Sequence, residues 1–284
     1  MMQQAHLTFW QGHAPWPKRS QIEQDLRLSR GVAAIFADSV LREHLAMRGG
    51  TVLHKAHLAP AARYSEDIDL VLVKTMDTQT LEQHLRRALT PVLGTPSDSI
   101  FADAWLAIRN VARPSRILRI SFKFVPLGLR REETIKVEVN LNESRSLYPL
   151  VDVQLNTLDN DGDLQPAVAR SYDINEMLGT KTRALMQREQ GRDLFDLCHA
   201  WQLSQAGNTP FPVDGRKAME AFAWYLKQEG TQIGTAEANA RLDARLRKDG
   251  FRRDMDTLLR PGLPRFDVDA GAAVVREAYL RHLG

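Results

Sequence analysis

The stretch Asp67-Ile68-Asp69-Leu70-Val71-Leu72-Val73 decides the fold of the region around it. Its apolar and β-branched residues predict a strand, in which residues two apart share a face about 6.6 Å from each other. Asp67 and Asp69 therefore lie on one face, while Ile68 and Leu70 turn to the core. Two acids on one face repel each other unless a cation neutralises them, and carboxylate oxygens suit Mg²⁺. The functional interpretation is a metal site, and the structural alternative is a pair of solvated acids at a strand end.

A second predicted strand, Thr134 to Leu141, supplies a third acid. Its alternation puts Lys136, Glu138 and Asn140 on one face and apolar residues on the other. If this strand lies beside the Asp67 strand, Glu138 becomes a third candidate metal ligand over the same patch. The alternative is the exposed polar face of a half-buried strand, which is the commoner origin of a single such glutamate.

Upstream of these acids, Gly49-Gly50-Thr51 combines flexible backbone with a hydroxyl just before a short predicted helix. Glycines let the main chain approach phosphate oxygens, and the N–H groups at a helix start favour anions. The triplet alone is typical of many turns. Followed by Arg63-Tyr64-Ser65-Glu66-Asp67-Ile68-Asp69, it indicates a phosphate-binding site more specifically.

Lys181 falls within the apolar stripe of a helix predicted to begin near Ile174. A lysine in such a stripe needs an anionic partner, which a triphosphate in a cleft would supply. The alternative is that its long side chain reaches out to solvent at the edge of the stripe. On the next predicted helix, Asp193 and Asp196 stand three residues apart, and they could belong to a site or to a salt-bridged helix end.

The 38 Lys and Arg against 35 Asp and Glu give a net charge of only +3, which by itself does not indicate a nucleic-acid-binding protein. Residues 104–131, however, contain seven cations and no acid. Such a basic stripe attracts polyphosphate or a nucleic-acid backbone, and a solvated face of a strand and its loops is the alternative. The candidate nucleic-acid-binding residues within it are Arg109, Arg113, Arg116, Arg119 and Lys123.

The 284 residues correspond to about two average domains. Predicted strands with helices around them indicate an α+β domain over residues 20–160, including a helix from Gln21 to Met47. The polar stretch from Asn156 to Asp163 is predicted to be a linker. Residues 165–284 are predicted to form a helical C-terminal domain, with Asp173 and Glu176 as a capping box near its start.

No signal-peptide pattern and no apolar run near the length of a membrane span occur in the sequence. The single cysteine, Cys198, cannot form an internal disulfide. We therefore expect a cytoplasmic protein without a membrane partner.

In combination, Gly49-Gly50-Thr51, the segment from Arg63 to Asp69, Lys181 with the residues after it, and Arg192-Asp193-Leu194-Phe195-Asp196 resemble the AbiEii/AbiGii toxin family. The resemblance spans roughly residues 25–205 and concerns nucleotidyltransferase-like proteins of bacterial toxin–antitoxin and phage-defence systems. It implies a DNA-polymerase-β-type nucleotidyltransferase core with a mixed sheet, followed by a helical bundle domain. It further implies use of a nucleoside triphosphate that depends on Mg²⁺ (or Mn²⁺).

The resemblance also implies roles for individual residues. Nucleotide binding falls to Gly49, Gly50, Thr51, Lys55, Ser65 and Lys181. Metal binding falls to Asp67 and Asp69, and Glu138 joins them through the strand pairing considered above. Catalysis falls to Asp67, Asp69, Lys181, Asp193 and Asp196. The distance in sequence from Thr51 to Asp67 exceeds the span usual in the broader superfamily, although a longer insert is common in this branch.

Related toxins of this group transfer nucleotides onto the 3′ end of tRNA. The expected function is therefore a toxin of a type IV-like toxin–antitoxin or abortive-infection system that modifies the tRNA acceptor end and blocks translation. Its expected partners are tRNA, a nucleoside triphosphate and a cognate antitoxin protein. Two alternatives are a transferase whose acceptor is a protein hydroxyl, and a non-catalytic nucleotide-binding regulator with the same fold.

Overall fold

The computed structural model describes residues 2–105 and 114–284, which fall into two compact units. The first unit runs to Ala104 and also contains Ser115–Ser146 and Leu150–Tyr172. The second contains Leu147–Pro149 and Asp173–Gly284. The candidate residues Arg109 and Arg113 lie outside the described residues.

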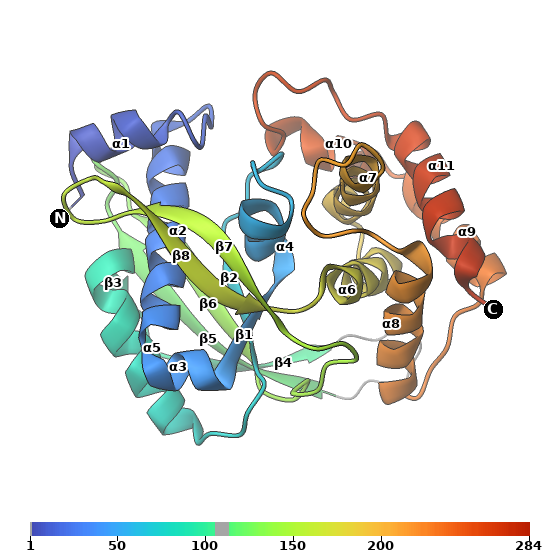
Figure 1. Cartoon of the computed structure of the whole chain (residues 1–284), viewed down its shortest axis with the longest axis horizontal. Coiled ribbons are helices and arrows are strands. Elements are labelled where there is room, and N and C mark those ends of the chain that lie inside the picture. The colour runs from blue at the N-terminus through green and yellow to red at the C-terminus, as the bar shows by residue number, and fades with distance from the viewer. Residues whose placement is uncertain (1, 106–113) are drawn as a thin grey trace. The chain divides into compact units, whose positions relative to one another are not determined.

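One mixed sheet organises the first unit (Figure 1). Within the described residues its strand order is β3-β5-β6-β2-β1-β8-β7, with β4 paired to β5. Strands β2 and β6 are parallel, as are β1 and β8, while the other pairs along this path are antiparallel. The strands are β1 (Leu45–Arg48), β2 (Ile68–Leu72), β3 (Thr95–Pro96), β4 (Ile100–Trp105), β5 (Pro114–Phe124), β6 (Glu133–Asn140), β7 (Val151–Leu158) and β8 (Leu164–Ser171).

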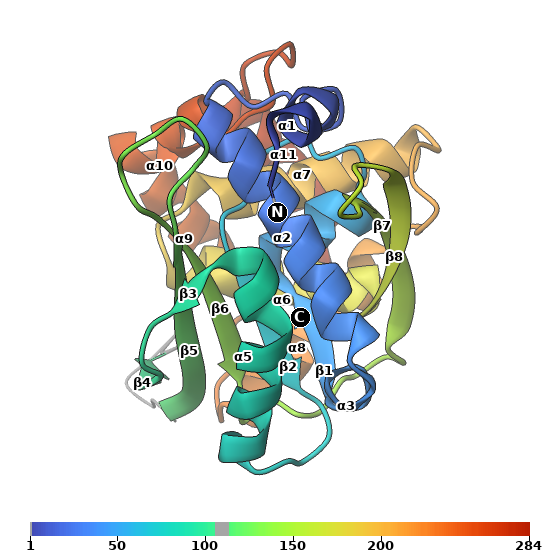
Figure 2. The same ribbon diagram turned by 90° about the vertical axis from the view of Figure 1, so that its left-hand side faces the viewer.

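Two long helices, α2 (Arg19–Ala37) and α5 (Thr78–Leu93), pack side by side over one face of the sheet (Figure 2). A Cβ built on Gly31 of α2 would lie 3.1 Å from both Ile68 of β2 and Leu93 of α5, so the three segments are in close contact. The first unit also contains α1 (Gln4–Trp10), α3 (Ser39–His44), α4 (Gly49–Val52) and a π-helical turn, Leu53–His57.

The opposite face of the central strands is polar. From Leu118 to Phe124 of β5 and from Ile135 to Val139 of β6, buried residues alternate with exposed or half-buried ones, and Asp69 of β2 is half-buried between the buried Ile68 and Leu70. This is the pattern of a strand with one face in the core. Asp67, Asp69 and Glu138 are all among the half-buried residues, so the fold presents them together on what we call the polar face of the sheet.

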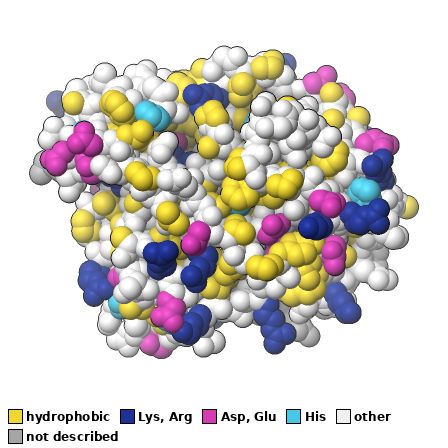
Figure 3. All heavy atoms as spheres, in the orientation of Figure 1, with side chains coloured by type: hydrophobic (Ala, Val, Ile, Leu, Met, Phe, Trp, Pro, Cys, Tyr) yellow, Lys and Arg dark blue, Asp and Glu magenta, His cyan; other side chains and the backbone are white. Residues whose placement is uncertain are grey.

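The described helices of the second unit are α6 (Ile174–Gln187), α7 (Gly191–Gln205), α8 (Gly215–Gln228), α9 (Thr235–Leu246), α10 (Asp249–Arg253) and α11 (Val268–Ala278). Short 3₁₀ turns follow at Asp254–Thr257 and Leu280–His282. No helix among the residues described is long and apolar enough to cross a bilayer. On the face drawn in Figure 3, basic and acidic side chains are interspersed.

The structure corrects three local predictions. Residues Leu45–Arg48 form strand β1 and not the end of a helix, because the short apolar run Leu45-Ala46-Met47 has no periodicity that separates a strand from a helix. The stretch from Asn156 to Asp163 is no linker, since it closes the hairpin of β7 and β8. Residues Leu164–Ser171 are accordingly a strand, and the boundary between the units follows Tyr172.

The third correction concerns Glu176. Asp173 caps α6 by accepting a hydrogen bond from the Asn175 N–H at 2.8 Å. Glu176 is fully buried and instead accepts from the N–H groups of Leu147 and Tyr148 and from the Tyr225 hydroxyl, at 2.8–2.9 Å. Burial raises the pKa of the Glu176 carboxyl above its usual value. Its role is to fasten the Leu147–Pro149 segment to the helices of the second unit.

Candidate active site

A row of charged residues crosses the polar face at one level. Asp69 of β2 is the register partner of Glu138 on β6, and Glu138 is in turn the partner of Arg119 on β5. On the other side of β2, Asp69 pairs with Arg48 of β1. Strand β6 thus lies beside β2, which was the condition for Glu138 to join the two aspartates.

Asp67 stands one residue before β2 and is mostly buried. Burial, together with the negative charges of Asp69 and Glu138, raises the pKa of its carboxyl from 3.8 to about 6, while Lys136 partly offsets this rise. A carboxylate whose ionised form is destabilised by its neighbours is one that a cation would stabilise. The donor set therefore fits a hard divalent metal held by oxygen ligands.

The Glu138 carboxylate points toward Arg119, its neighbour in this row on β5. Its Oε1 accepts a hydrogen bond of 2.7 Å from Arg119 Nε. Within the described parts of the chain, no three His, Cys, Asp or Glu side chains converge closely enough to hold an ion between them. Mutual repulsion of like charges and the pull of Arg119 on Glu138 account for the open arrangement. Asp67, Asp69 and Glu138 share a face and remain proposed metal ligands.

Gly49 forms a close contact with the second aspartate. Its φ is +87°, and a Cβ placed on it would lie 2.0 Å from Asp69 Oδ2 and 2.8 Å from Asp69 Cγ. Only glycine fits both the backbone conformation and the space. The turn from β1 into α4 therefore packs closely against Asp69. The backbone of Gly49 lies directly beside this candidate metal ligand.

We expect Gly49→Ala to lower nucleotidyl transfer at least about 100-fold, because the added methyl must displace Asp69. The positive φ alone should reduce the free energy of unfolding by about 1–2 kcal/mol. Gly128→Ala is the matched control, since Gly128 has a φ of +80° and nothing within 4 Å of its Cβ position. Denaturant titration and initial rates should show similar stability losses and an activity loss confined to Gly49→Ala. An equal loss of activity in both variants would refute the steric explanation.

Thr51 and Ser65 act on the chain that leads to the acids. Thr51 is buried, and its hydroxyl lies 2.5 Å from the Asp67 carbonyl oxygen and 2.9 Å from the Ser65 hydroxyl. The Thr51 hydroxyl thus holds the segment that carries Asp67. Its predicted contact with a phosphate stays a prediction.

Lys55 is anchored in a buried network. Its ammonium donates to Asp25 Oδ1 at 2.5 Å and to Ser29 Oγ at 3.1 Å. Asp25 is 2% exposed and also accepts from the indole N–H groups of Trp10 and Trp16, at 2.8 and 2.9 Å. Lys55 thus compensates the charge of a buried carboxylate and anchors the π-helical turn on α2. Its predicted contact with the nucleotide stays a prediction.

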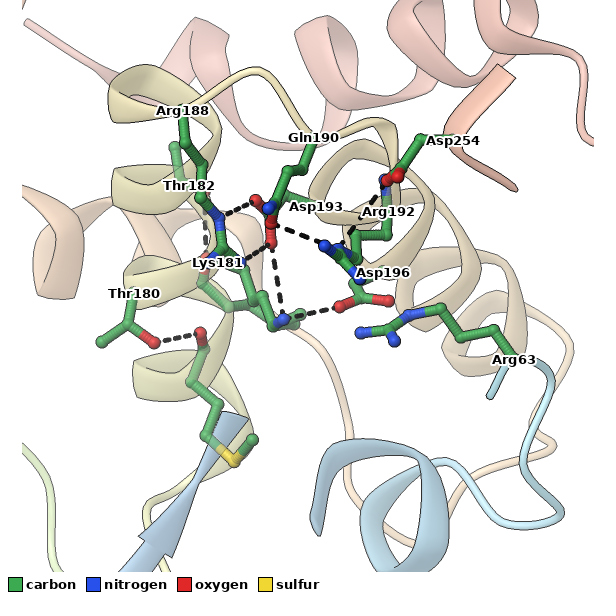
Figure 4. A network of polar contacts seen from close by, with 12 residues as sticks. Arg63, Thr180, Lys181, Thr182, Arg188, Gln190, Arg192, Asp193, Asp196 and Asp254 are labelled. Atoms are coloured by element: carbon green, nitrogen blue, oxygen red, sulfur yellow. Dashed lines mark hydrogen bonds and ion pairs between the residues drawn. The ribbon is translucent and has the colours of Figure 1, made fainter. Parts of the chain in front are cut away.

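In the second unit, the anionic partners of Lys181 come from α7 (Figure 4). Its ammonium lies 2.7 Å from Asp196 Oδ2 and 3.4 Å from Asp193 Oδ1, and both aspartates are fully buried. Arg188 binds Asp193 through two hydrogen bonds of 2.7 and 2.8 Å. Lys181 therefore does not extend to solvent from the edge of the apolar stripe. Its anionic partners lie within its own unit.

Within its described part, the predicted basic stripe has residues on both faces of β5. In the alternation of β5, Arg119 and Lys123 belong to the polar face, whereas Arg116 has the parity of the buried Leu118 and Ile120. The Arg116 guanidinium lies 4.8 Å from the centre of the Phe101 ring. Arg119 is bound to Glu138, so this arginine belongs to the carboxylate row rather than to a separate nucleic-acid surface.

Sequence reasoning left three neighbours of the acids without a role. Arg48 lies opposite Asp69 in the register and forms an ion pair with Glu143. Its position directly before the two glycines was the available signal. Asp25 gave no local signal, because its partners are 9–30 residues away in sequence. Lys136 was placed on the face of Glu138 by alternation, and the structure shows it next to Asp67.

The chain is similar to solved structures that include a nucleotidyltransferase toxin. MenT4, a nucleotidyltransferase toxin from Mycobacterium tuberculosis H37Rv, aligns with 97% of this chain and 89% of its own at 16% identity and a TM-score of 0.61. JHP933 from Helicobacter pylori aligns over 92% of this chain and 91% of its own, also at 16% identity, with a TM-score of 0.51. These similarities establish a nucleotidyltransferase-toxin fold and confirm the predicted fold class. Comparison with curated protein sequences finds no match.

A family model described as the nucleotidyl transferase AbiEii toxin of type IV toxin–antitoxin systems matches residues 31–272. The chain belongs to this family, as the resemblance of its motifs predicted. It is accordingly a nucleotidyltransferase toxin of a toxin–antitoxin system.

Proposed function

We propose that this toxin transfers nucleotides from a nucleoside triphosphate to the 3′-hydroxyl at the acceptor end of tRNA and thereby blocks translation. The observation that carries the proposal is the cluster of Asp67, Asp69 and Glu138 on one face of the sheet, with the backbone of Gly49 packed against Asp69. The raised pKa of the Asp67 carboxyl agrees with it. A cluster of carboxylates next to a glycine turn fits metal-assisted transfer of a phosphoryl-linked group.

In this reaction the RNA 3′-oxygen attacks the α-phosphorus of the triphosphate, the bond to the bridging oxygen breaks, and pyrophosphate leaves. Asp67, Asp69 and Glu138 would hold Mg²⁺ or Mn²⁺, which when bound lowers the pKa of the attacking hydroxyl and neutralises phosphate charge. We place the triphosphate beside the backbone of Gly49 and Gly50, where Asp69 packs against the first glycine and Arg63 and Ser65 pack against the second. Thr51 and Ser65 hold the Asp67 segment in place.

We further propose that Lys181 binds substrate phosphate, with Asp193 and Asp196 fixing the position of its ammonium. Two buried carboxylates orient the lysine, and Arg188 compensates the second of them. An oriented cation can stabilise the charge that develops on the departing pyrophosphate. The protein partner we propose is a cognate antitoxin, which the family implies.

The acceptor is tested by incubating the protein and Mg²⁺ with each of the four α-labelled triphosphates, first with total tRNA and then with an RNA-free cell extract. The proposal expects label in the tRNA. Label in protein would assign the acceptor hydroxyl to a side chain. Absence of label from both, with triphosphate binding retained, would identify a non-catalytic nucleotide-binding protein. Omission of the divalent metal should abolish labelling.

A further inference from the structure

Arg119 and Lys136 are two cations on the polar face that differ in their bonding partners. Arg119 is bound to Glu138 by the hydrogen bond of 2.7 Å. Lys136 lies two residues before Glu138 on the same strand and is exposed. Among the residues that the structure describes, its ammonium has no ion pair or hydrogen bond. Lys136 is therefore a positive charge on the same face as the acids, and no ion pair within the described residues neutralises it.

The register places this lysine next to the reacting groups. Ile68 pairs with Val137 and Asp69 with Glu138, so Asp67 and Lys136 are the next neighbours along the same parallel strands. The attraction between their opposite charges partly offsets the rise in the pKa of Asp67 that burial and Asp69 cause. On the far side of Lys136, its register partner on β5 is the neutral Ser121.

The two sides of β2 offer different chemistry. On the β1 side lies the glycine turn, with Gly49 against Asp69. On the β6 side lies Lys136, and beyond it Lys123 of β5, which has only an exposed contact of 3.8 Å with Glu132. If the triphosphate occupies the glycine side, as the proposed function has it, the lysine side is left to the second substrate. A single ammonium suits the single negative charge of a phosphodiester.

We propose that Lys136 binds a backbone phosphate of the acceptor RNA near its 3′ end and so places the terminal hydroxyl at the Asp67 side of the site. This inference rests on the proposed function, because it requires an RNA acceptor. Lys136 is a substrate-binding residue in this assignment. Lys123, on the same face, lies where the RNA strand would continue away from the acids.

The test compares Lys136→Gln and Lys136→Arg with Lys74→Gln. Lys74 is an exposed lysine that follows the opposite end of β2 and forms an ion pair with Glu43. Total tRNA is titrated at several salt concentrations without triphosphate, and each α-labelled triphosphate is titrated separately without RNA. Wild-type labelling of tRNA is measured in the same preparations.

Lys136→Gln should weaken tRNA binding about three- to tenfold and reduce the salt slope by about 1. Triphosphate affinity should be unchanged. Lys136→Arg should restore tRNA binding, and Lys74→Gln should match the wild type. Unchanged tRNA affinity and slope in Lys136→Gln would overturn the inference, as would a loss of triphosphate affinity alone. Failure of the wild type to label tRNA would refute the proposed function itself, so the two failures are distinguishable.

Discussion

Replacement of Asp67 by Asn should lower nucleotidyl transfer by at least about 10³-fold and leave the fold intact. The side chains are nearly equal in size, so packing is conserved, while the charge that would hold the metal is lost. Transfer rates at saturating metal and triphosphate, together with circular dichroism, provide the measurement. An Asp67→Asn protein with more than about a tenth of wild-type activity would remove this residue from the site.

The same variant should be more stable than the wild type at neutral pH. The folded-state pKa of Asp67 is raised from 3.8 to about 6, so ionisation disfavours the folded protein. The stability contributed by the protonated group is present below pH 4 and is lost as the pH rises from about 4 to 6. Removing the charge should therefore stabilise the protein at pH 7 by on the order of 1–3 kcal/mol. Urea titrations at pH 4.5 and pH 7 should show the larger difference between the variant and the wild type at the higher pH.

The Lys181 network should give the second large effect, on stability. Asp196→Ala leaves the Lys181 ammonium, 9% exposed, with only the longer contact of 3.4 Å to Asp193. Breaking one side of a buried ion pair costs about 3–5 kcal/mol. We expect a loss of this size in the free energy of unfolding, measured by urea titration.

A double variant separates structure from function at this network. Lys181→Met with Asp196→Leu removes both charges, while Arg188 continues to compensate Asp193. It should recover part of the stability that Asp196→Ala loses and remain deficient in triphosphate binding. Recovery of both stability and triphosphate affinity would show that Lys181 has only a structural role.

Local patterns predicted that the three acids share a face. The alternation of Asp67 to Val73 and of Thr134 to Leu141 placed the acids on one face, because a strand with one buried face permits only one assignment of its residues. The order of β2 and β6 could not be derived this way, since the paired residues of these strands are 69 positions apart in the sequence. The resemblance to a family supplied the fold that makes them neighbours.

The contacts that the sequence did not predict join residues distant in sequence. Lys181 was recognised as a cation that needs an anion, and two aspartates of its own unit supply it. Lys55 entered only as a nucleotide-binding residue implied by the family resemblance, and it pairs with Asp25. Nothing in the sequence near Lys55 points to Asp25, because that contact depends on how α2 packs. Within the described part of the basic stripe, Arg116 and Arg119 are an odd number of residues apart, so β5 turns them to opposite faces.

The central claim is most directly tested by the mass of tRNA 3′-terminal fragments after incubation with the protein, Mg²⁺ and each triphosphate. The account predicts a gain of one or more nucleotide units at the 3′ end, with one pyrophosphate released per unit, and no gain with Asp67→Asn. Pyrophosphate release without a gain in RNA mass, or an equal gain with Asp67→Asn, would contradict it.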